Sequence, residues 1–169
     1  MQKIQATLIK NQVTSNSSNA HTLFQKSKFG EKLNQKILYS LQEALFLTEK
    51  NKIQISDSKG KTLTEEELLK KFSRTDKNFT TKYPVFKDLT EKGYSIKTAL
   101  KFGADFRIYE KNQSHSKWVC YTTTENSPLK WQDFAAKNRV AHSTKKKLLI
   151  AIVDEENCVS YYETNWTRP

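Results

Sequence analysis

Hydrophobic residues recur at helical spacing in two stretches of the N-terminal half, and a helix-capping signal precedes each stretch. Ser40 and Thr64 are each followed three positions later by a glutamate. This is the capping-box pattern, in which a hydroxyl and a carboxylate satisfy exposed N–H groups of the first helical turn. Apolar side chains in 41–48 and in 68–72 then fall on one helix face. The pattern predicts two short amphipathic helices.

The residues around these helices read as strand, turn and loop. Residues 53–55 alternate apolar and polar as a strand does, and 57–60 has the composition of the turn that follows it. The stretch 14–21 is polar and rich in Ser and Asn. We expect it to be a surface loop.

In the C-terminal half the pattern changes from helical to strand-like. Tyr83-Pro84 predicts a helix start, because proline suits the first turn of a helix, and Gly93 is placed to end that helix. One further helix is expected at about 129–142. Strands are expected at 95–99, 104–110, 116–123, 147–153 and 158–164. Residues 148–153 are apolar on both faces, which predicts the central strand.

These elements predict two domains of the α/β (α+β) class. Residues 1–80 should form a small N-terminal α/β domain with helices over a small sheet, and residues 84–169 a C-terminal domain with a mixed sheet flanked by helices. A chain of 169 residues is long enough to bury a core in this way.

The charge balance points to a polyanionic partner. Lys and Arg outnumber Asp and Glu by 29 to 18, giving a net charge of +11 and a pI near 9.6. Nucleic acid is the first partner to consider, although a soluble basic protein without such a partner explains the charge equally well. No signal peptide is apparent and no apolar run is long enough to span a membrane. A cytoplasmic protein with no membrane association is expected.

Common catalytic and cofactor motifs are absent from the sequence. It contains no P-loop, GxGxxG, GxSxG or HExxH, and Cys120 and Cys158 lack the spacing of a zinc site. A metal-dependent nuclease would need paired carboxylates, for which only Asp105 and Asp154 are in suggestive places. We therefore predict no metal and no cofactor.

The C-terminal half contains two long motifs, GYSIKTALKFGADFRIYE at 93–110 and RVAHSTKKKLLIAIVD at 139–154. Both resemble motifs of archaeal tRNA-splicing endonucleases. The similarity continues through Tyr161-Tyr162, and the helix at 41–47 resembles one in the N-terminal domain of that family. The resemblance implies a nuclease-like C-terminal domain and an RNA-cleaving enzyme.

The catalytic residues of the family fall on Tyr109, His115 and Lys146. Cutting RNA without a metal requires a base that removes the ribose 2′-OH proton and an acid that protonates the leaving 5′-oxygen. The resemblance implies Tyr109 as base and His115 as acid; the side chains alone leave this assignment open, because a histidine could in principle do either job. Lys146 would stabilise the extra negative charge of the transition state. The products would be a 2′,3′-cyclic phosphate and a 5′-OH.

The resemblance also implies how RNA is held and how the subunits assemble. Arg139 and Trp166 match the positions that sandwich a flipped bulge base in pre-tRNA with a bulge–helix–bulge. The family works as homo-oligomers, dimers or tetramers, or as a heterotetramer with a paralogous structural subunit. An acidic loop mediates assembly, and here the loop 122–130 has only Glu125 as an acid. The alternative function is a noncatalytic, structural RNA-binding subunit of such a complex.

Overall fold

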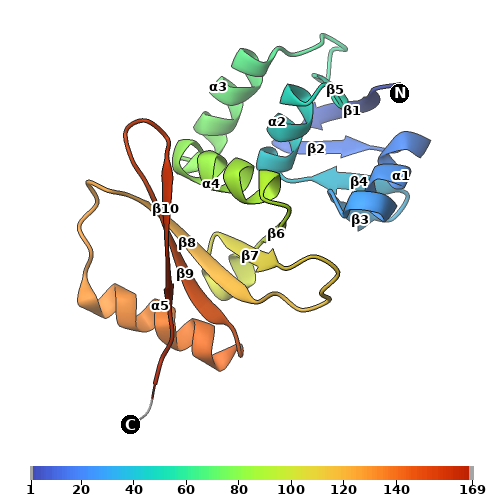
Figure 1. Cartoon of the computed structure of the whole chain (residues 1–169). Coiled ribbons are helices and arrows are strands. Elements are labelled where there is room, and N and C mark those ends of the chain that lie inside the picture. The colour runs from blue at the N-terminus through green and yellow to red at the C-terminus, as the bar shows by residue number, and fades with distance from the viewer. Residues whose placement is uncertain (1, 168–169) are drawn as a thin grey trace. The chain divides into compact units, whose positions relative to one another are not determined.

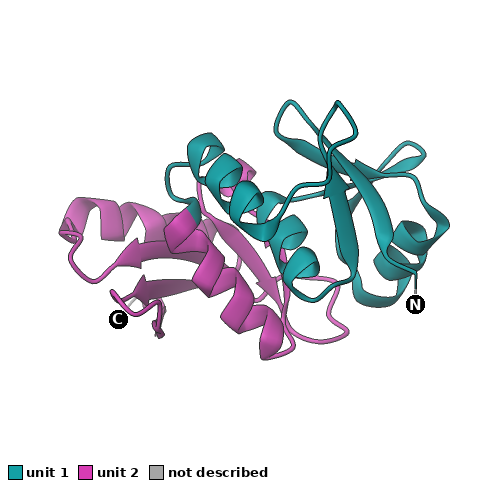
Figure 2. Ribbon diagram, turned by 90° about the horizontal axis from the view of Figure 1, so that it is seen from above, with its two compact units in different colours: residues 1–79 teal, residues 80–169 magenta. Residues whose placement is uncertain are grey.

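The protein folds into two compact units in its computed structural model, which describes residues 2–167. The first unit comprises residues 1–79 and the second residues 80–169 (Figure 2). Each has its own sheet, helices and buried side chains.

In the N-terminal unit, helices accompany a small mixed sheet, as predicted (Figure 1). The strand order is β3-β4-β2-β1-β5, in which only β1 and β5 run parallel among these neighbours. The strands are β1 (Ile4–Ile9), β2 (Gln12–Ser15), β3 (Glu31–Leu33), β4 (Lys36–Tyr39) and β5 (Ile53–Ser56). The helices are α1 (Ser18–Ser27), α2 (Leu41–Glu49) and α3 (Glu65–Thr75).

Both predicted capping boxes are present. Ser40 caps α2 and Thr64 caps α3, and in each case the glutamate three positions on accepts a hydrogen bond from the backbone N–H of the cap residue. The capping carboxylate of α2, Glu43, is 4% exposed and also accepts a bond from the backbone N–H of Gly30 at 2.9 Å. This helix start is therefore tied to the chain segment before β3.

The predicted surface loop at 14–21 is wrong. Its first residues belong to β2, and α1 begins at Ser18 with Ser17 as its N-cap. Polar side chains there form hydrogen bonds with the protein backbone instead of with water. The Ser15 hydroxyl is buried and donates to the Gln5 carbonyl at 2.5 Å. Ala20 is fully buried, so this polar stretch contributes directly to the core.

The C-terminal unit contains the predicted mixed sheet, in the order β10-β9-β8-β7-β6. The strands are β6 (Ser95–Thr98), β7 (Phe106–Tyr109), β8 (Trp118–Thr124), β9 (Lys147–Val153) and β10 (Val159–Thr164). The helices are α4 (Phe79–Glu91), the short 3-10 helix η1 (Leu100–Phe102) and α5 (Trp131–Ser143). β8 and β9 pair in parallel, whereas the other neighbours pair antiparallel. The middle strand is β8, so the expectation that 148–153 would be central is wrong by one place.

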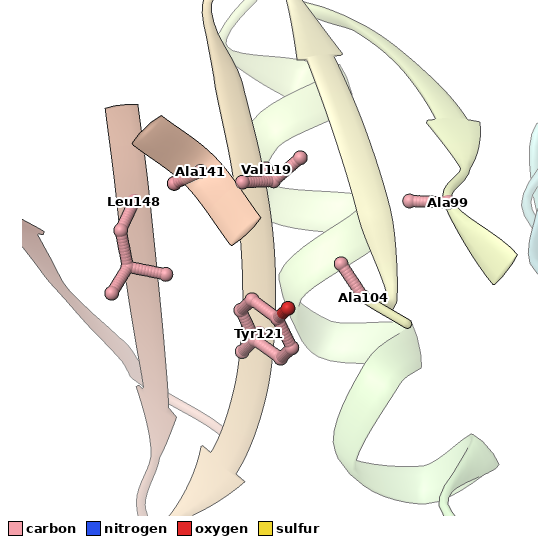
Figure 3. Packing of buried hydrophobic residues seen from close by; sticks show 6 residues of the cluster. All are labelled: Ala99, Ala104, Val119, Tyr121, Ala141 and Leu148. Carbon is pink, nitrogen blue, oxygen red and sulfur yellow. The ribbon is translucent and has the colours of Figure 1, made fainter. Parts of the chain in front are cut away.

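Helices α4 and α5 cover opposite faces of this sheet. Phe86 of α4 lies against Phe106 with ring centroids 6.1 Å apart, on one face. Ala141 of α5 packs with Val119, Tyr121 and Leu148 on the other face (Figure 3). Because neighbouring residues of a strand point to opposite faces, odd-numbered β7 and β8 residues and even-numbered β9 residues lie toward α5.

Helix α4 begins earlier than predicted. It starts at Phe79, which places Pro84 inside the helix instead of in its first turn. Proline removes one backbone hydrogen bond of a helix, but Phe79, Val85 and Phe86 are almost fully buried, and this burial favours the longer helix. The predicted glycine end is correct, since Gly93 has a φ of +91° and donates to the Thr90 carbonyl.

Candidate active site

Strand register brings Tyr109 and Lys146 to the same end of the C-terminal sheet. Ile108 pairs with Trp118, and Trp118 pairs with Lys147. β7 runs antiparallel to β8 and β8 parallel to β9, so the C-terminal end of β7 meets the N-terminal ends of β8 and β9. Tyr109, the last residue of β7, and Lys146, which directly precedes β9, therefore lie at the same end of the sheet.

Both side chains belong to the face that α5 covers. Lys146 stands two positions before Leu148, and Tyr109 two positions after Arg107. Leu148 packs against α5, and the Arg107 guanidinium lies 5.7 Å from the ring centroid of Phe102, which packs on the same cluster. Strand alternation thus gives Tyr109 and Lys146 a common face, on which both are half-buried.

The backbone at Lys146 is fixed by the end of α5. Its N–H donates to the Ala141 carbonyl at 2.8 Å, and the N–H of Lys145 donates to the His142 carbonyl at 2.9 Å. Lys145 adopts a left-handed φ of 55°, which turns the chain from the helix into β9. The C-terminal end of a helix carries partial negative charge, so a lysine is favourable at this position.

His115 lies in the loop that joins β7 to β8, at the same end of the sheet, and it is exposed. The loop is closed at its base by an ion pair in which the Lys117 ammonium donates to the Glu110 carboxylate at 2.6 Å. The backbone N–H of Lys117 also donates to the Ile108 carbonyl at 2.9 Å. The loop that carries His115 is therefore short and anchored at both ends.

A second group of polar side chains crosses the sheet at this end, and the sequence analysis did not identify it. Glu163 of β10 accepts from the Trp118 indole and from the Lys147 ammonium, each at 2.6 Å. Hydrogen bonds from Lys147 first, and from Trp118, hold the pKa of Glu163 below its ordinary value. The hydrogen bond to Glu110 raises the pKa of Lys117.

The two residues expected to bind RNA lie near the C-terminal part of α5. Arg139 is exposed on the helix, and its guanidinium donates back to the Ala135 carbonyl at 3.4 Å. Trp166 follows β10 and is 47% exposed. Its ring packs against the imidazole of His142, with centroids 4.6 Å apart. His142 lies three residues after Arg139, so both occupy the same side of the helix.

The two acids weighed for metal binding have structural partners. Asp105 accepts from the backbone N–H and the hydroxyl of Thr122 and lies 3.4 Å from the Lys82 ammonium. Asp154 accepts from backbone N–H groups of the turn before β10. Across residues 2–167 we find no group of three His, Cys, Asp or Glu side chains arranged to hold a metal ion. No helix in this range is long and apolar enough to cross a membrane.

Both units match known family profiles. Residues 79–161 match the family described as tRNA intron endonuclease, catalytic C-terminal domain. Residues 4–69 match the family described as tRNA intron endonuclease, N-terminal domain. The two matches follow one another in the order in which the units follow one another along the chain.

Curated relatives match most of the chain. A tRNA-splicing endonuclease of Thermococcus gammatolerans is 42% identical over 147 residues, covering 86% of this chain and 87% of the relative. One of Nanoarchaeum equitans is 40% identical over 139 residues, covering 76% and 88%. One of Methanococcus vannielii is 37% identical over 146 residues, covering 85% and 82%. With two domain profiles and relatives of this similarity and coverage, the chain belongs to the tRNA-splicing endonuclease family.

Proposed function

We propose that this chain is the catalytic subunit of an endonuclease that cuts pre-tRNA at the bulge–helix–bulge of its intron junctions. The observation that carries the proposal is the strand register, by which the C-terminal end of β7 and the N-terminal ends of β8 and β9 lie at one end of the sheet. Tyr109, the loop of His115 and Lys146 belong to that end. A tyrosine, a histidine and a lysine together supply what RNA transesterification requires.

The reaction proceeds by attack of a ribose 2′-oxygen on the adjacent phosphorus. Tyr109 takes the proton of the 2′-OH, the bond between O2′ and phosphorus forms, and the bond between phosphorus and O5′ breaks. His115 donates a proton to the departing O5′. The products are a 2′,3′-cyclic phosphate and a free 5′-OH, and no metal ion or other cofactor takes part.

Lys146 stabilises the transition state. The pentacoordinate phosphorus carries more negative charge than the starting phosphodiester, so a fixed ammonium beside it binds the transition state more tightly than the substrate. Lys146 is suited to this task because its backbone is tied to Ala141 and its side chain is half-buried.

Substrate recognition rests on shape and on flipped bases. The bases of a bulge are unstacked and can be held between flat side chains, whereas an A-form helix is read chiefly through its backbone. Arg139 and Trp166 are the residues proposed to hold a bulge base, by stacking and cation–π attraction.

The active enzyme is an oligomer, in which this chain pairs with itself as a dimer or tetramer or with a paralogous structural subunit as a heterotetramer. The loop 125–130 between β8 and α5 has a single acid, Glu125, while the chain as a whole is strongly basic. A partner with a more acidic loop would complement this chain better than a second copy does.

The test is cleavage of a bulge–helix–bulge RNA in EDTA by the purified chain, with the product ends mapped. The variants are Tyr109→Phe, His115→Ala and Lys146→Gln. His21→Ala is the control for the histidine, because His21 lies in the N-terminal unit and contacts the Gln35 carbonyl. Lys145→Gln is the control for the lysine, because it removes the same charge one residue away.

Cyclic-phosphate ends are expected, with the rate at saturating RNA reduced at least about hundredfold in His115→Ala and Lys146→Gln and much less in the controls. Cleavage that appears only when a paralogous subunit is added would identify a hetero-oligomer. A chain that supports cleavage by a partner while its own three variants remain fully active would be the noncatalytic subunit, and the proposal would be wrong.

A further inference from the structure

Five side chains form a continuous line of contacts across the end of the sheet that carries Tyr109 and Lys146. We call them the sheet-end network: Glu110, Lys117, Trp118, Lys147 and Glu163. The Lys117 ammonium donates to Glu110 at 2.6 Å and lies 4.4 Å from the centroid of the Trp118 ring. The Trp118 indole and the Lys147 ammonium each donate to one oxygen of Glu163 at 2.6 Å.

Each proposed catalytic residue is a close sequence neighbour of a member of this network. Glu110 directly follows Tyr109, Lys117 stands two residues after His115, and Lys147 directly follows Lys146. The network also links β7, β8, β9 and β10, because Glu110 directly follows β7, Trp118 belongs to β8, Lys147 to β9 and Glu163 to β10. A displacement at any of these contacts would therefore move the backbone that carries a catalytic side chain.

The Lys117 ammonium is directed away from the face proposed for catalysis. By strand alternation Trp118 lies on the α4 face, where its ring meets the ring of Tyr94 edge-on with centroids 5.7 Å apart. The Lys117 ammonium sits over this same indole and on the Glu110 carboxylate. Its charge is paired within the protein, whereas a lysine that contacts a phosphate is expected to have its ammonium open to the RNA.

We propose that the Lys117–Glu110 ion pair, supported by Trp118 and Glu163, positions the His115 loop for proton transfer. This inference rests on the proposed function, because it concerns the geometry of that site. Lys117 is a positioning residue, and it contacts neither the RNA nor the reacting atoms.

The proposal predicts an effect on rate that exceeds the effect on stability. Lys117 and Glu110 are partly exposed, at 39% and 44% of their side-chain surface, and ion pairs of this exposure contribute little to global stability. Catalysis is more sensitive, since a misplacement of about 1 Å can cost about a hundredfold in rate. Loss of the pair should thus leave folding almost unchanged and slow the chemical step.

The experiment compares Lys117→Met with Lys61→Met in single-turnover cleavage of the bulge–helix–bulge RNA. Lys61 is a matched control: it forms an exposed ion pair with Glu67 at 2.5 Å, in the N-terminal unit, and its loss changes the net charge equally. A third protein carries Glu110→Lys and Lys117→Glu together, which restores the pair with its charges exchanged. Urea unfolding midpoints and RNA dissociation constants are measured for all variants.

Lys117→Met is expected to cut about tenfold more slowly at saturating RNA, with an RNA dissociation constant and an unfolding midpoint equal to those of Lys61→Met. The exchanged pair should recover part of the lost rate, because the ion pair is restored whereas the contact of the Lys117 ammonium with the Trp118 ring is not. A dissociation constant that rises more in Lys117→Met than in Lys61→Met would mean that Lys117 binds RNA directly and would overturn the positioning role. A rate equal to that of Lys61→Met would overturn it as well.

Lys146→Gln and amide hydrogen exchange separate this inference from the proposed function. If Lys146→Gln is inactive while Lys117→Met is fully active, only the positioning role fails. If Lys146→Gln is fully active, the proposed mechanism fails. Exchange at residues 111–117 tests the loop without any cleavage: it should accelerate in Lys117→Met and return toward the parent rate in the exchanged pair, and an unchanged exchange rate would refute the proposal.

Discussion

Trp166 illustrates how a single exposed side chain can be prepared for binding. One part of its ring rests against the imidazole of His142, at 4.6 Å between centroids and 44° between planes, while 47% of the residue is exposed. An indole already held by a neighbour loses little conformational freedom when a base stacks on its open side. Trp166 therefore suits a base-stacking role better than a mobile tryptophan would.

We predict that Trp166→Ala weakens binding of a bulge-containing RNA by about 1–3 kcal/mol, the range for loss of one stacked base. Trp166→Phe should retain most of the affinity, because it keeps a flat ring. Binding is measured by fluorescence anisotropy, with Trp131→Ala as the matched control, since Trp131 is 77% exposed and its ring contacts Phe134. Equal losses in both alanine variants would argue against a specific stacking role for Trp166.

Sequence patterns pointed to some residues of the candidate site and did not reveal others. The family motif singled out Tyr109, His115 and Lys146, and the predicted strands around them are correct to within a few residues. Trp118 and Glu163 could not be paired in this way, because they are 45 residues apart and meet only through the register of β8, β9 and β10. A hydrogen bond of this kind has no local signal in the chain.

Among the secondary-structure elements, those whose sequence signal lies within a few consecutive residues were predicted, and those stabilised by distant contacts were not. The helices that begin after Ser40 and Thr64 were predicted because a capping box lies within four consecutive residues. Strand β2 and helix α1 were missed, since the hairpin before β2 turns on Lys10 and Asn11, with φ of 45° and 66°, rather than on glycine. The burial that stabilises these two elements is not visible in their polar composition.

The two capping boxes provide a prediction at this scale. Glu43→Ala should lower the free energy of unfolding by about 1–3 kcal/mol, because it removes the buried carboxylate that accepts from the N–H groups of Gly30 and Ser40. Glu67→Ala removes the same side chain from an exposed cap, where water can replace the lost hydrogen bonds, and should lower the free energy of unfolding by less than Glu43→Ala does. Urea denaturation of each variant gives both values. A larger loss for Glu67→Ala would show that burial of the cap does not set its contribution.

At the scale of the whole molecule, the net charge of +11 is not confined to the unit that contains the proposed active site. Lys and Arg outnumber Asp and Glu in residues 1–79 as well as in residues 80–169. The relatives in Thermococcus gammatolerans and Methanococcus vannielii match this chain over more than four-fifths of its length. Both units therefore carry enough positive charge to contact a long polyanion. The binding free energy is expected to come from contacts along the length of that polyanion.

This distribution predicts that RNA binding depends steeply on salt, whereas the chemical step does not. If the protein neutralises about six phosphates, the slope of log affinity against log salt is about −4 to −5, which lowers affinity about 250- to 1,000-fold between about 50 and 200 mM salt. Lys146→Gln should reduce the slope by about one, since it removes one proposed phosphate contact, and Lys61→Met serves as the control. Titrations at several salt concentrations, with single-turnover rates at saturating RNA beside them, measure both quantities. A slope near zero would mean that the positive charge serves something other than RNA, and that recognition rests on stacking alone.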